Sequence, residues 1–583
     1  MMRKVLQRLC SVMLSIVMVT GMIPASFAAD SGAKFQNGPY LLAPKTTSMV
    51  VVWESTEKVS STIAYGTDEN KLCDPIKVDI NADAPDFKGK QMNLFHYKLD
   101  NLTPGTRYYY EVKLEGGETC KASFKTLSDK PDQIRLITLS DSHIFATRKE
   151  LDQAIKEFDP DLLLHCGDMV EGTGAQAEQF SFWFQGKVEN DYIHSYPVVY
   201  SSGNHDQGGV YFNTYVYSIQ DEEYGAEVEG DSSFNYAGLH IITMNSNPWG
   251  LFQMNSEATG QKADAATIKT IDNAMNWLKK DLATDAAKNA DFRLIFMHHP
   301  VSDAYTKRYI PAVIEPGKVD LLLSGHTHSY ARAVSSNPAV GAGTIYLTHQ
   351  DARTYNKKGD FFYITSTPGS GILDVKNYGA TAEGQDSKVA NETLVAKDKQ
   401  QLSWSDISIS PNEVLYNGEV TVTAKVTNNG KGLAAAVIPV QDNGKTRYLY
   451  QFKDGVVTLD PGKSTTLTGT LRMESLGTHT LKLADKTATV NVKYRPATFD
   501  YTNIRTQQGN GTTSDMNSNV LHIKADVVNI GNDAGTGTAE FKVNGVTVGT
   551  RQYTLKSGES QTAEFAYTFD KAGKYEVTIG NAK

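Results

Sequence analysis

Short stretches of alternating or β-rich sequence dominate the chain between residues 35 and 128. The clearest are 48–54, 62–65 and 108–114, and turn residues such as Thr103-Pro104-Gly105 separate them. Alternation over a few residues predicts strands with one buried face, and several short strands joined by turns are typical of a β-sandwich. The pattern therefore predicts a small all-β sandwich domain over residues 35–128.

The pattern changes at residue 134, where continuous apolar runs begin to alternate with helical periodicity. Continuous runs predict buried strands, and their alternation with helices predicts an α/β domain, with helices flanking the sheets, over residues 133–379. The longest helical pattern covers 265–282 and predicts an amphipathic helix. Its apolar positions are Ile268, Ile271, Met275, Leu278 and Leu282. The apolar runs are 135–139, 161–165, 198–201, 240–244, 292–297 and 319–323.

Beyond residue 379 a polar, weakly patterned stretch predicts a linker at 380–399, after which β-type alternation returns. Two successive parts of this last region resemble each other. A repeat with a period of about one hundred residues predicts two tandem units, here immunoglobulin-like β-sandwiches at 400–494 and 495–583. Segments 426–430, 459–464 and 477–481 are matched by 527–531, 555–560 and 573–577.

The first residues have the organisation of a secretory signal peptide. Arg3, Lys4 and Arg8 precede an apolar run, and small residues follow it up to Ala28, the expected cleavage site. A retained membrane anchor is the alternative, but the run is short for a span that needs about 20 residues. We therefore expect residues 1–28 to be removed. The mature protein, with no later integral membrane segment, is then expected to be secreted or attached to the cell surface.

The net charge limits the classes of binding partner, and the cysteines limit which disulfides the protein could form. The 583-residue chain has 57 Lys and Arg against 66 Asp and Glu, a formal net charge of -9, so it offers no broad basic surface to nucleic acid. Export would permit a disulfide between Cys73 and Cys120, which share a predicted domain, and the sequence leaves open whether it forms. Cys166 lies inside an apolar run and is expected to be a buried thiol.

Five short motifs rich in metal-binding side chains recur in order through the α/β region. Carboxylate, carboxamide and imidazole groups bind divalent or trivalent metals, and no thiolate cluster competes with them. Each motif begins where an apolar run ends, which places it at the carboxyl edge of a strand. We therefore expect the motifs to converge on a hydrolytic site with two metal ions. They are Asp141-Ser142-His143, Gly167-Asp168, Gly203-Asn204-His205-Asp206, His298-His299-Pro300 and Gly325-His326-Thr327-His328.

This set of motifs, in this order, resembles that of the calcineurin-like metallophosphoesterases, and within them the purple acid phosphatase branch. The resemblance covers residues 134–332, where Tyr330 and Arg332 extend the last motif. Upstream, Asn37-Gly38-Pro39-Tyr40 and 102–110 resemble the fibronectin type III-like N-terminal domain of those phosphatases. The resemblance implies a metallophosphoesterase domain packed beside that N-terminal domain.

Carried over position by position, the family pattern implies two metal sites that share a bridging carboxylate, Asp168. Two such ions acidify a water and hold the phosphoryl oxygens, so that a metal-bound hydroxide attacks the phosphorus. Iron, manganese, zinc and cobalt all accept these ligands, so the identity of the two ions stays open. The implied ligands are Asp141, His143 and His328 for one ion and Asn204, His298 and His326 for the other.

Further residues near the motifs are candidates for contact with substrate. His205 is expected to stabilise the transition state or to protonate the leaving group, with Asp206 orienting it. His299 is expected to face the substrate or to support a metal ligand. Tyr305 and Arg308 follow the fourth motif, in a segment that either binds the substrate phosphate or is an ordinary surface loop.

One position departs from the purple enzymes. Their iron-binding tyrosine lies three residues after the bridging aspartate, and here that position is Glu171. The first motif carries His143 instead, as in the non-purple members of the superfamily. The resemblance therefore implies a colourless or pale enzyme.

The leading functional prediction is an exported phosphatase that hydrolyses phosphomonoesters. A phosphodiesterase or nucleotidase is the close alternative, because the same metal core serves both reactions. A cell-surface binding or adhesion protein is the alternative from another class. The two C-terminal modules resemble adhesion-type, CARDB-like repeats, so a cell wall, a glycan or a protein is their expected ligand.

Overall fold

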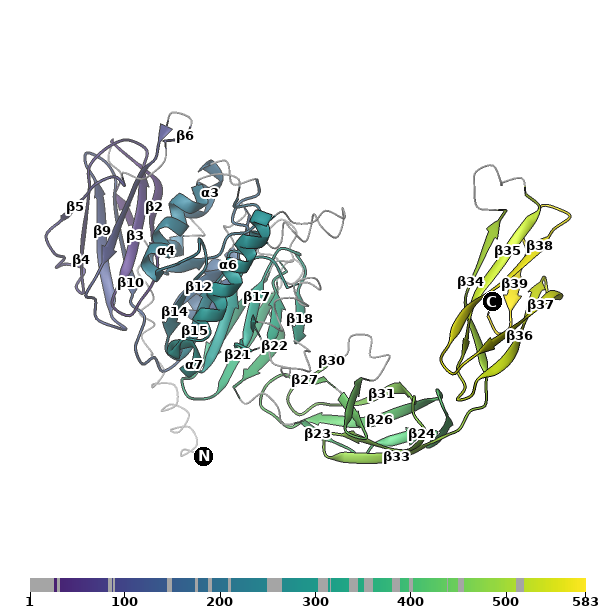
Figure 1. Cartoon of the computed structure of the whole chain (residues 1–583). Helices are drawn as coiled ribbons and strands as arrows, with labels where there is room; N and C mark the ends of the chain where they lie inside the picture. Colours follow the sequence, from purple (N-terminus) through teal and green to yellow (C-terminus); the bar gives the residue numbers. More distant parts are fainter. Residues whose placement is uncertain are drawn as a thin grey trace, which may run out of the picture. The chain divides into compact units, whose positions relative to one another are not determined.

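The computed structural model describes residues 26–28, 32–81, 86–87, 90–143, 149–172, 177–186, 191–207, 211–248, 265–301, 313–314, 316–334, 344–350, 360–379, 388–397, 402–437, 439–448, 456–509 and 518–582 (Figure 1). The chain divides into two compact units. The first holds Met1–Gln401 with Asn428–Ala435 and Thr458–Gly462, and the second holds the rest. Within the described ranges, no helix combines the length and the apolar character that crossing a membrane requires.

Two sheets form the N-terminal domain, which confirms the predicted all-β fold. Aromatic and branched side chains fill the space between them, and Trp53 stacks on Phe95 with ring centroids 5.5 Å apart. One sheet has the order β1 (Ser26–Ala28), β10 (Thr119–Lys125), β9 (Arg107–Leu114), β4 (Ser61–Gly66) and β5 (Ile76–Val78). The other has the order β2 (Phe35–Leu42), β3 (Met49–Ser55) and β8 (Asn93–Leu99), and a separate hairpin joins β6 (Asp86–Phe87) to β7 (Lys90–Gln91).

Strand β3 is buried on both faces, in keeping with its continuous apolar run from Met49 to Trp53. Val51 and Trp53 point into the sandwich, and Val50 and Val52 join the hydrophobic core of the next domain. The second face is covered because the α/β domain packs against it. Tyr215 of that domain donates a buried hydrogen bond of 2.8 Å to Glu54.

Strand β1 lies inside the predicted signal peptide. It pairs with β10 at the edge of the five-stranded sheet, with Ser26 opposite Lys121 and Ala28 opposite Thr119. Cleavage after Ala28 would therefore remove an edge strand and leave β10 at that edge.

Two six-stranded mixed sheets form the centre of the α/β domain, and each contains a run of neighbouring parallel strands, at one side of the first sheet and in the middle of the second. The first has the order β13 (Val198–Tyr200), β12 (Leu162–His165), β11 (Ile134–Leu139), β20 (Asp360–Ser366), β21 (Ile372–Gly379) and β22 (Lys388–Ala396). The second has the order β14 (Ser232–Tyr236), β15 (Leu239–Thr243), β16 (Phe292–Phe296), β17 (Leu321–Ser324), β19 (Ile345–Thr348) and β18 (Ala331–Val334). The helical segments are α2 (Lys149–Phe158), α3 (Ala177–Phe184), η1 (Asp191–His194), η2 (Asn213–Tyr217), α4 (Ser218–Tyr224), α6 (Ala265–Asp281) and α7 (Asp285–Asn289).

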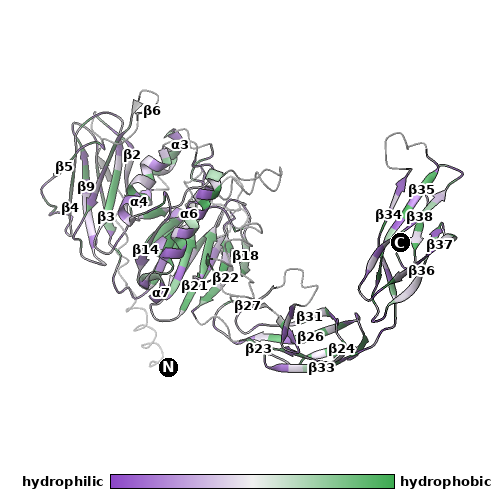
Figure 2. Ribbon diagram, in the orientation of Figure 1, coloured by the Kyte–Doolittle hydropathy of each residue, from purple (hydrophilic) through white to green (hydrophobic). Residues whose placement is uncertain are grey.

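Helix α6 lies across the second sheet (Figure 1), with hydrophilic residues along its outer face (Figure 2). Ile271, Met275 and Leu278 are buried against β15, β16 and β17, as their spacing predicts. Ile268 is 36% exposed, so the predicted apolar stripe is wrong at that position. It lies in the first turn of the helix, beyond the reach of the sheet core.

The predicted linker at 380–399 is wrong over most of its described part. Residues 388–396 form β22, which pairs with β21 along its length, so the first sheet continues to Ala396. Leu394 and Val395 supply the apolar positions of this strand, but the polar residues around them hide the pattern in the sequence. Residues 380–387 lie outside the described residues.

The C-terminal region is β-rich throughout, as the repeat predicts. The strands of its first half are β23 (Leu402–Trp404), β24 (Ser408–Ser410), β25 (Glu413–Leu415), β26 (Glu419–Asn428), β27 (Ala434–Val437), β28 (Pro439–Asp442), β29 (Lys445–Tyr448), β30 (Val456–Leu459), β31 (Ser464–Arg472), β32 (Gly477–Leu483) and β33 (Lys486–Lys493). Those of the second half are β34 (Phe499–Gln508), β35 (Val520–Asn529), β36 (Gly535–Val543), β37 (Val546–Leu555), β38 (Ser560–Thr568) and β39 (Val577–Ile579).

The internal repeat has a structural basis in two equivalent asparagines, Asn428 and Asn529. Both are fully buried, and each donates to two backbone carbonyls and accepts the N–H of the residue two positions later. The partners are Gly430, Gly432 and Leu459 for Asn428, and Gly531, Asp533 and Leu555 for Asn529. Each asparagine therefore joins two loops at one end of its repeat.

The described cysteines are all free thiols. Cys73 is exposed, and Cys120 and Cys166 are buried, the last as its apolar run predicts. The disulfide that the sequence leaves open between Cys73 and Cys120 is not formed in this structure.

Candidate metal centre

The five motifs lie where strands of both sheets end. Asp141 follows β11, Asp168 follows β12 and Asn204 follows β13 in the first sheet, while His298 follows β16 and His326 follows β17 in the second. The loops that carry them are joined directly by backbone hydrogen bonds, since the N–H of residue 141 donates to the carbonyl of residue 167 and that of residue 325 to the carbonyl of residue 298. The N–H of His326 also donates to the carboxylate of Asp141 at 3.0 Å, so parallel strands of both sheets end at one site.

One group of potential metal ligands consists of Asp141, His143, Asp168 and His328. Each offers one ligand atom, and these atoms lie within 4.8 Å of one another. The Nε2 atom of His328 is 3.1 Å from the carboxylate of Asp141. The sequence predicts all four as metal ligands: Asp141, His143 and His328 bind one ion, and Asp168 bridges the two ions.

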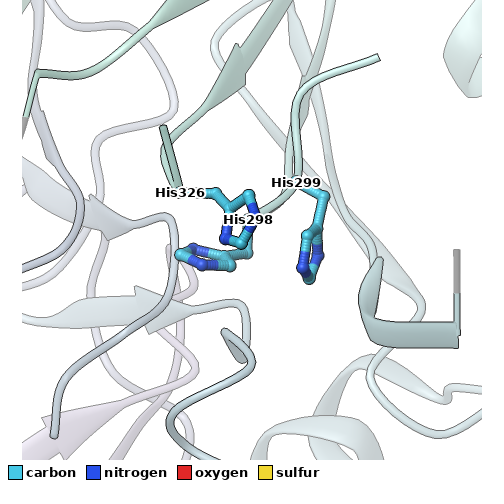
Figure 3. Close-up of side chains that lie close together, drawn as sticks. All are labelled: His298, His299 and His326. Atoms are coloured by element: carbon cyan, nitrogen blue, oxygen red, sulfur yellow. The ribbon is translucent and has the colours of Figure 1, made fainter. Parts of the chain in front are cut away.

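A second group consists of His298, His299 and His326, whose ligand atoms also lie within 4.8 Å of one another. Figure 3 shows the three imidazoles gathered beside two neighbouring loops. His298 Nε2 is 3.1 Å from the side-chain oxygen of Asn204 and 3.1 Å from the carboxylate of Asp168. Asp168 therefore contacts the second group as well as belonging to the first, which is the position that a bridging ligand requires.

The backbone of the ligand loops is held in an unfavourable conformation. Asp141, His143, Asp168, His326 and His328 all have positive φ angles, of 53°, 50°, 56°, 70° and 52°. Residues with a Cβ atom adopt this left-handed region at a cost, and such residues persist where the surrounding structure holds them for a function. Five of the fifteen described non-glycine residues with a positive φ angle carry potential metal ligands.

Asp206 holds two of these loops together. Its fully buried carboxylate accepts hydrogen bonds from the backbone N–H groups of Asp168, Met169, Val170 and Gly203, at 2.8, 2.8, 3.3 and 2.8 Å. The prediction that Asp206 orients the ring of His205 is wrong, because its oxygens are directed at the backbone of the Asp168 and Gly203 loops. Asp206 is thus a positioning residue for the ligands.

His205 lies at the open side of the site. Its side chain is 35% exposed, and its Nδ1 atom hydrogen-bonds the carbonyl of Glu171 at 2.6 Å. The Nε2 atom is 4.0 Å from the carboxylate of Asp168, and its ring is 5.0 Å from that of His143. The ring is therefore held through Nδ1, while Nε2 lies beside the ligand cluster.

His143 is oriented by the segment that follows the bridging aspartate. Its Nδ1 atom is 3.1 Å from the carbonyl of Val170 and 3.1 Å from the carboxylate of Glu171. A histidine held in this way at one nitrogen presents the other to a metal. Glu171 lies three residues after Asp168, where the resemblance places the tyrosine of the purple enzymes. Its carboxylate contacts His143, the ligand candidate of the first motif.

Replacing Glu171 by glutamine should weaken metal binding by about 10-fold or more, because the outer partner of a ligating histidine tunes its basicity and orientation. The Glu171 side chain is 47% exposed, so the fold should be unaffected. Competition with a chelator measures the affinity, and Glu178→Gln, an exposed acid in α3, is the matched control. Equal metal affinity in Glu171→Gln and in the wild type would contradict this role.

The electrostatics of the site favour a bound cation. Burial opposes ionisation of Asp141 and Asp168, yet His328 beside the first and His298 beside the second lower the pKa of each carboxyl. Burial and the charge of Asp168 raise the pKa of Asp206 to about 7. Burial lowers the pKa of His298, but Asp168 and Asp141 outweigh it and raise that pKa to about 9. A proton on His298 thus offsets buried negative charge, which metal ions would offset more fully, so the donor set fits metal binding.

The sequence does not reveal the role of Ser246, which lies just after β15. Its hydroxyl accepts a 2.8 Å hydrogen bond from the backbone N–H of His299 and is 3.1 Å from the Nδ1 atom of that ring. Nε2 of His299 is buried with no hydrogen-bond partner among the described residues. Burial, and next the charge of His298, lower the pKa of His299 well below its usual value, so the ring is neutral. Ser246 therefore orients a neutral imidazole within the second group.

Two of the predicted substrate contacts, Tyr305 and Arg308, lie outside the described residues.

A Ser-His-Asp arrangement also occurs in the C-terminal region. His479 is 2.5 Å from the carboxylate of Asp442 through Nδ1 and 3.2 Å from the hydroxyl of Ser475 through Nε2. The Nε2 atom is also 2.9 Å from the carbonyl of Ser475, and a carboxylate and a carbonyl both accept, so both ring nitrogens donate. In the second repeat, Tyr575 donates to the carbonyl of Lys571 at the matching positions. Both nitrogens of His479 are therefore held by acceptors, and neither is available as a base that could activate the Ser475 hydroxyl. The arrangement is structural.

Comparison with known proteins identifies two of the domains. Residues 134–330 match the family model for calcineurin-like phosphoesterase, and residues 39–126 match that for the purple acid phosphatase N-terminal domain. No curated protein sequence matches the chain.

Solved structures resemble the chain only distantly. PhoD is 12% identical, over 63% of this chain and 91% of PhoD, with a TM-score of 0.44. A predicted phosphoesterase from Streptococcus pneumoniae TIGR4 is 11% identical, over 45% of this chain and 98% of its own, with a TM-score of 0.22. Vps29 of Chaetomium thermophilum is 8% identical, over 45% and 98%, with a TM-score of 0.25.

The family matches and the carboxylate–histidine site define the class of protein: it is a metallophosphoesterase, a phosphoric ester hydrolase. More particularly, residues 134–330 belong to the calcineurin-like phosphoesterase family, and a purple acid phosphatase N-terminal domain precedes them.

Proposed function

We propose that the protein hydrolyses phosphomonoesters with the help of two metal ions. The observation that carries this proposal is the position of Asp168. Its carboxylate lies within the group of Asp141, His143 and His328, and it is also 3.1 Å from His298 of the second group. A shared carboxylate between two sets of ligands is what a dinuclear hydrolytic centre needs.

The two groups of side chains would divide the ions between them. Asp141, His143 and His328 would hold one ion, and Asn204, His298 and His326 the other. Ions bound there would supply an acidified water and positive charge for the phosphoryl oxygens. His299, held by Ser246, is either a further ligand of the second ion or a neutral donor to the substrate.

His205 is proposed as the catalytic residue that contacts the ester. Its Nδ1 hydrogen bond to the Glu171 carbonyl fixes the ring and leaves Nε2 beside the cluster. A histidine in this position can donate a proton to the departing oxygen or stabilise the developing charge.

The donor atoms limit the two metal ions to a class and do not single out one metal. Iron, manganese, zinc and cobalt all accept carboxylate, carboxamide and imidazole ligands. Glu171 replaces the tyrosine that binds iron in the purple enzymes, and its carboxylate contacts His143. Without a tyrosinate ligand, the protein is proposed to be colourless or pale. An intense visible band from the iron-loaded protein would contradict this part of the proposal.

Turnover of matched aryl phosphomonoester and phosphodiester substrates tests the reaction. The protein supplied with each candidate metal should release phenol faster from the monoester, and Asn204→Ala should abolish the metal-dependent rate. A preference for the diester would replace the proposal with the phosphodiesterase or nucleotidase alternative. No metal-dependent turnover of either ester would contradict both.

Export remains part of the proposal, on the basis of the signal-peptide organisation at residues 1–28. The C-terminal repeats would then serve outside the cell, where a wall, glycan or protein surface is their proposed ligand. Mass spectrometry of the exported protein tests the first point, because its N-terminus should begin after Ala28. An intact N-terminus on the exported protein would contradict cleavage there.

A further inference from the structure

A cavity of about 520 Å³ lies in the α/β domain, lined by Arg293 near the start of β16, whereas the metal-ligand candidates follow the end of that strand. Arg293 at the start of this strand lines the cavity, and His298 follows its end. Five residues of strand separate the two positions, about 16 Å at roughly 3.3 Å per residue. A small molecule in the cavity therefore would not reach the metal centre.

The walls of this cavity carry concentrated positive charge. Lys279, Lys288, Arg293 and Lys318 line it, and no carboxylate is among its described lining residues. Asp320 offsets the charge of Arg293, accepting from its Nε and Nη2 atoms at 3.1 and 3.0 Å. The three lysines form no ion pair within the described part of the chain. Three lysines without an ion pair among the described residues, on a chain of net charge -9, make this a distinct local feature.

Helix geometry accounts for part of this arrangement. Lys279 lies in the last turn of α6 and Lys288 in the last turn of α7, where lysines favour the negative end of the helix dipole. That preference does not explain Lys318, which lies in a turn with a φ angle of 55°. A lysine is strained in this conformation, which suits glycine better. Helix-terminal preference therefore accounts for two of the three lysines that line the cavity and not for Lys318.

Apolar surface completes the cavity. Leu282 and Val313 line it and are 6% and 8% exposed, and Asp320 also accepts a 2.8 Å hydrogen bond from the backbone N–H of Arg293. The volume falls in the range of about 300–1,000 Å³ typical of small-molecule sites. Apolar walls with several cations suit a ligand that combines a ring or chain with a multiply charged anion.

We propose that this cavity binds an organic phosphate monoester as a ligand separate from the reaction at the metal centre. A phosphomonoester is a dianion near neutral pH, and lysine ammonium groups bind phosphate as compact point charges. The apolar wall would receive the organic part. This inference does not depend on which ester the metal centre hydrolyses.

Isothermal titration of the metal-loaded, full-length protein with phenylphosphonate, which carries no ester bond to hydrolyse, tests the proposal. The wild type should show two classes of site, one at the metal centre and one at the cavity. Lys279→Ala combined with Lys318→Gly should weaken the cavity class by about 10-fold or more and leave the other unchanged. Inorganic phosphate should bind the cavity more weakly than phenylphosphonate, because it lacks the apolar part.

Two controls keep the outcome decisive. Lys280 is adjacent to Lys279 but lies outside the cavity and pairs with Glu227 at 3.8 Å, so Lys280→Ala should leave both classes intact. Lys318→Gly relieves a positive φ angle, so the variant should be at least as thermally stable as the wild type. An isotherm that the double substitution leaves unchanged would overturn the proposal, whereas a single class that the double substitution weakens would support it and count only against binding at the metal centre.

Discussion

Replacing Asp168 by asparagine is expected to lower phosphate-ester turnover by about 1000-fold or more, the scale of losing a preorganised charge interaction in the transition state. It should also leave at most one metal ion per chain. Asp168 is 1% exposed and reaches both groups of ligands, so no neighbouring carboxylate can replace it. Metal content and turnover of the same preparation measure the two effects together.

Asp129→Asn is the matched control for this substitution, because Asp129 is exposed and lies outside the motifs. Asp129→Asn should bind as many metal ions as the wild type and hydrolyse the phosphate ester at the same rate. Full activity in Asp168→Asn would mean that the carboxylate does not join the two sites. Loss of activity with both ions retained would assign it a role in positioning substrate rather than in binding metal.

Replacing Asp206 by asparagine is expected to destabilise the protein, whereas replacing the adjacent His205 by alanine should not. Four backbone N–H groups donate to Asp206, and an amide retains only one accepting oxygen. Each buried donor left unsatisfied costs about 1–3 kcal/mol. The melting temperature of Asp206→Asn should therefore fall by at least ~5 °C, at about 2–4 °C per kcal/mol for a domain of this size.

Replacing His205 by alanine should leave the thermal stability unchanged and lower the turnover. Its ring is partly exposed and hydrogen-bonds only backbone carbonyls, so the melting temperature should stay within about a degree of the wild type. Turnover should fall by about 100-fold or more, the usual contribution of a general acid or base. A stable Asp206→Asn, or a His205→Ala variant with normal turnover, would contradict the division of roles between these neighbours.

The metal ligands could be predicted from the sequence because each occupies a short motif at the end of an apolar run. Parallel strands of one sheet deliver their carboxyl ends to one edge, so the proximity of Asp141 and Asp168 follows from the pattern of runs, whereas their contact with His298 depends on how the second sheet packs against the first. Ser246 could not be found in this way. It follows a strand of the same sheet, but a serine there has no motif, and its role depends on the neighbouring position of His299.

The role of Asp206 was mistaken for a related reason. Adjacent residues in a loop point in different directions, so proximity in sequence to His205 says little about contact. Similarly, β22 was mistaken for a linker because it pairs with strands that lie elsewhere in the sequence, and the apolar run of β3 does not show what covers its second face. The second face of β3 is covered by another domain, and β22 extends a sheet whose other strands begin far upstream.

Anomalous diffraction from crystals of the metal-loaded protein tests the central claim most directly. Two anomalous peaks should appear on either side of the Asp168 carboxylate, one among Asp141, His143 and His328 and the other among Asn204, His298 and His326. A single peak, or a pair of peaks that Asp168 does not join, would contradict a dinuclear centre built on these residues.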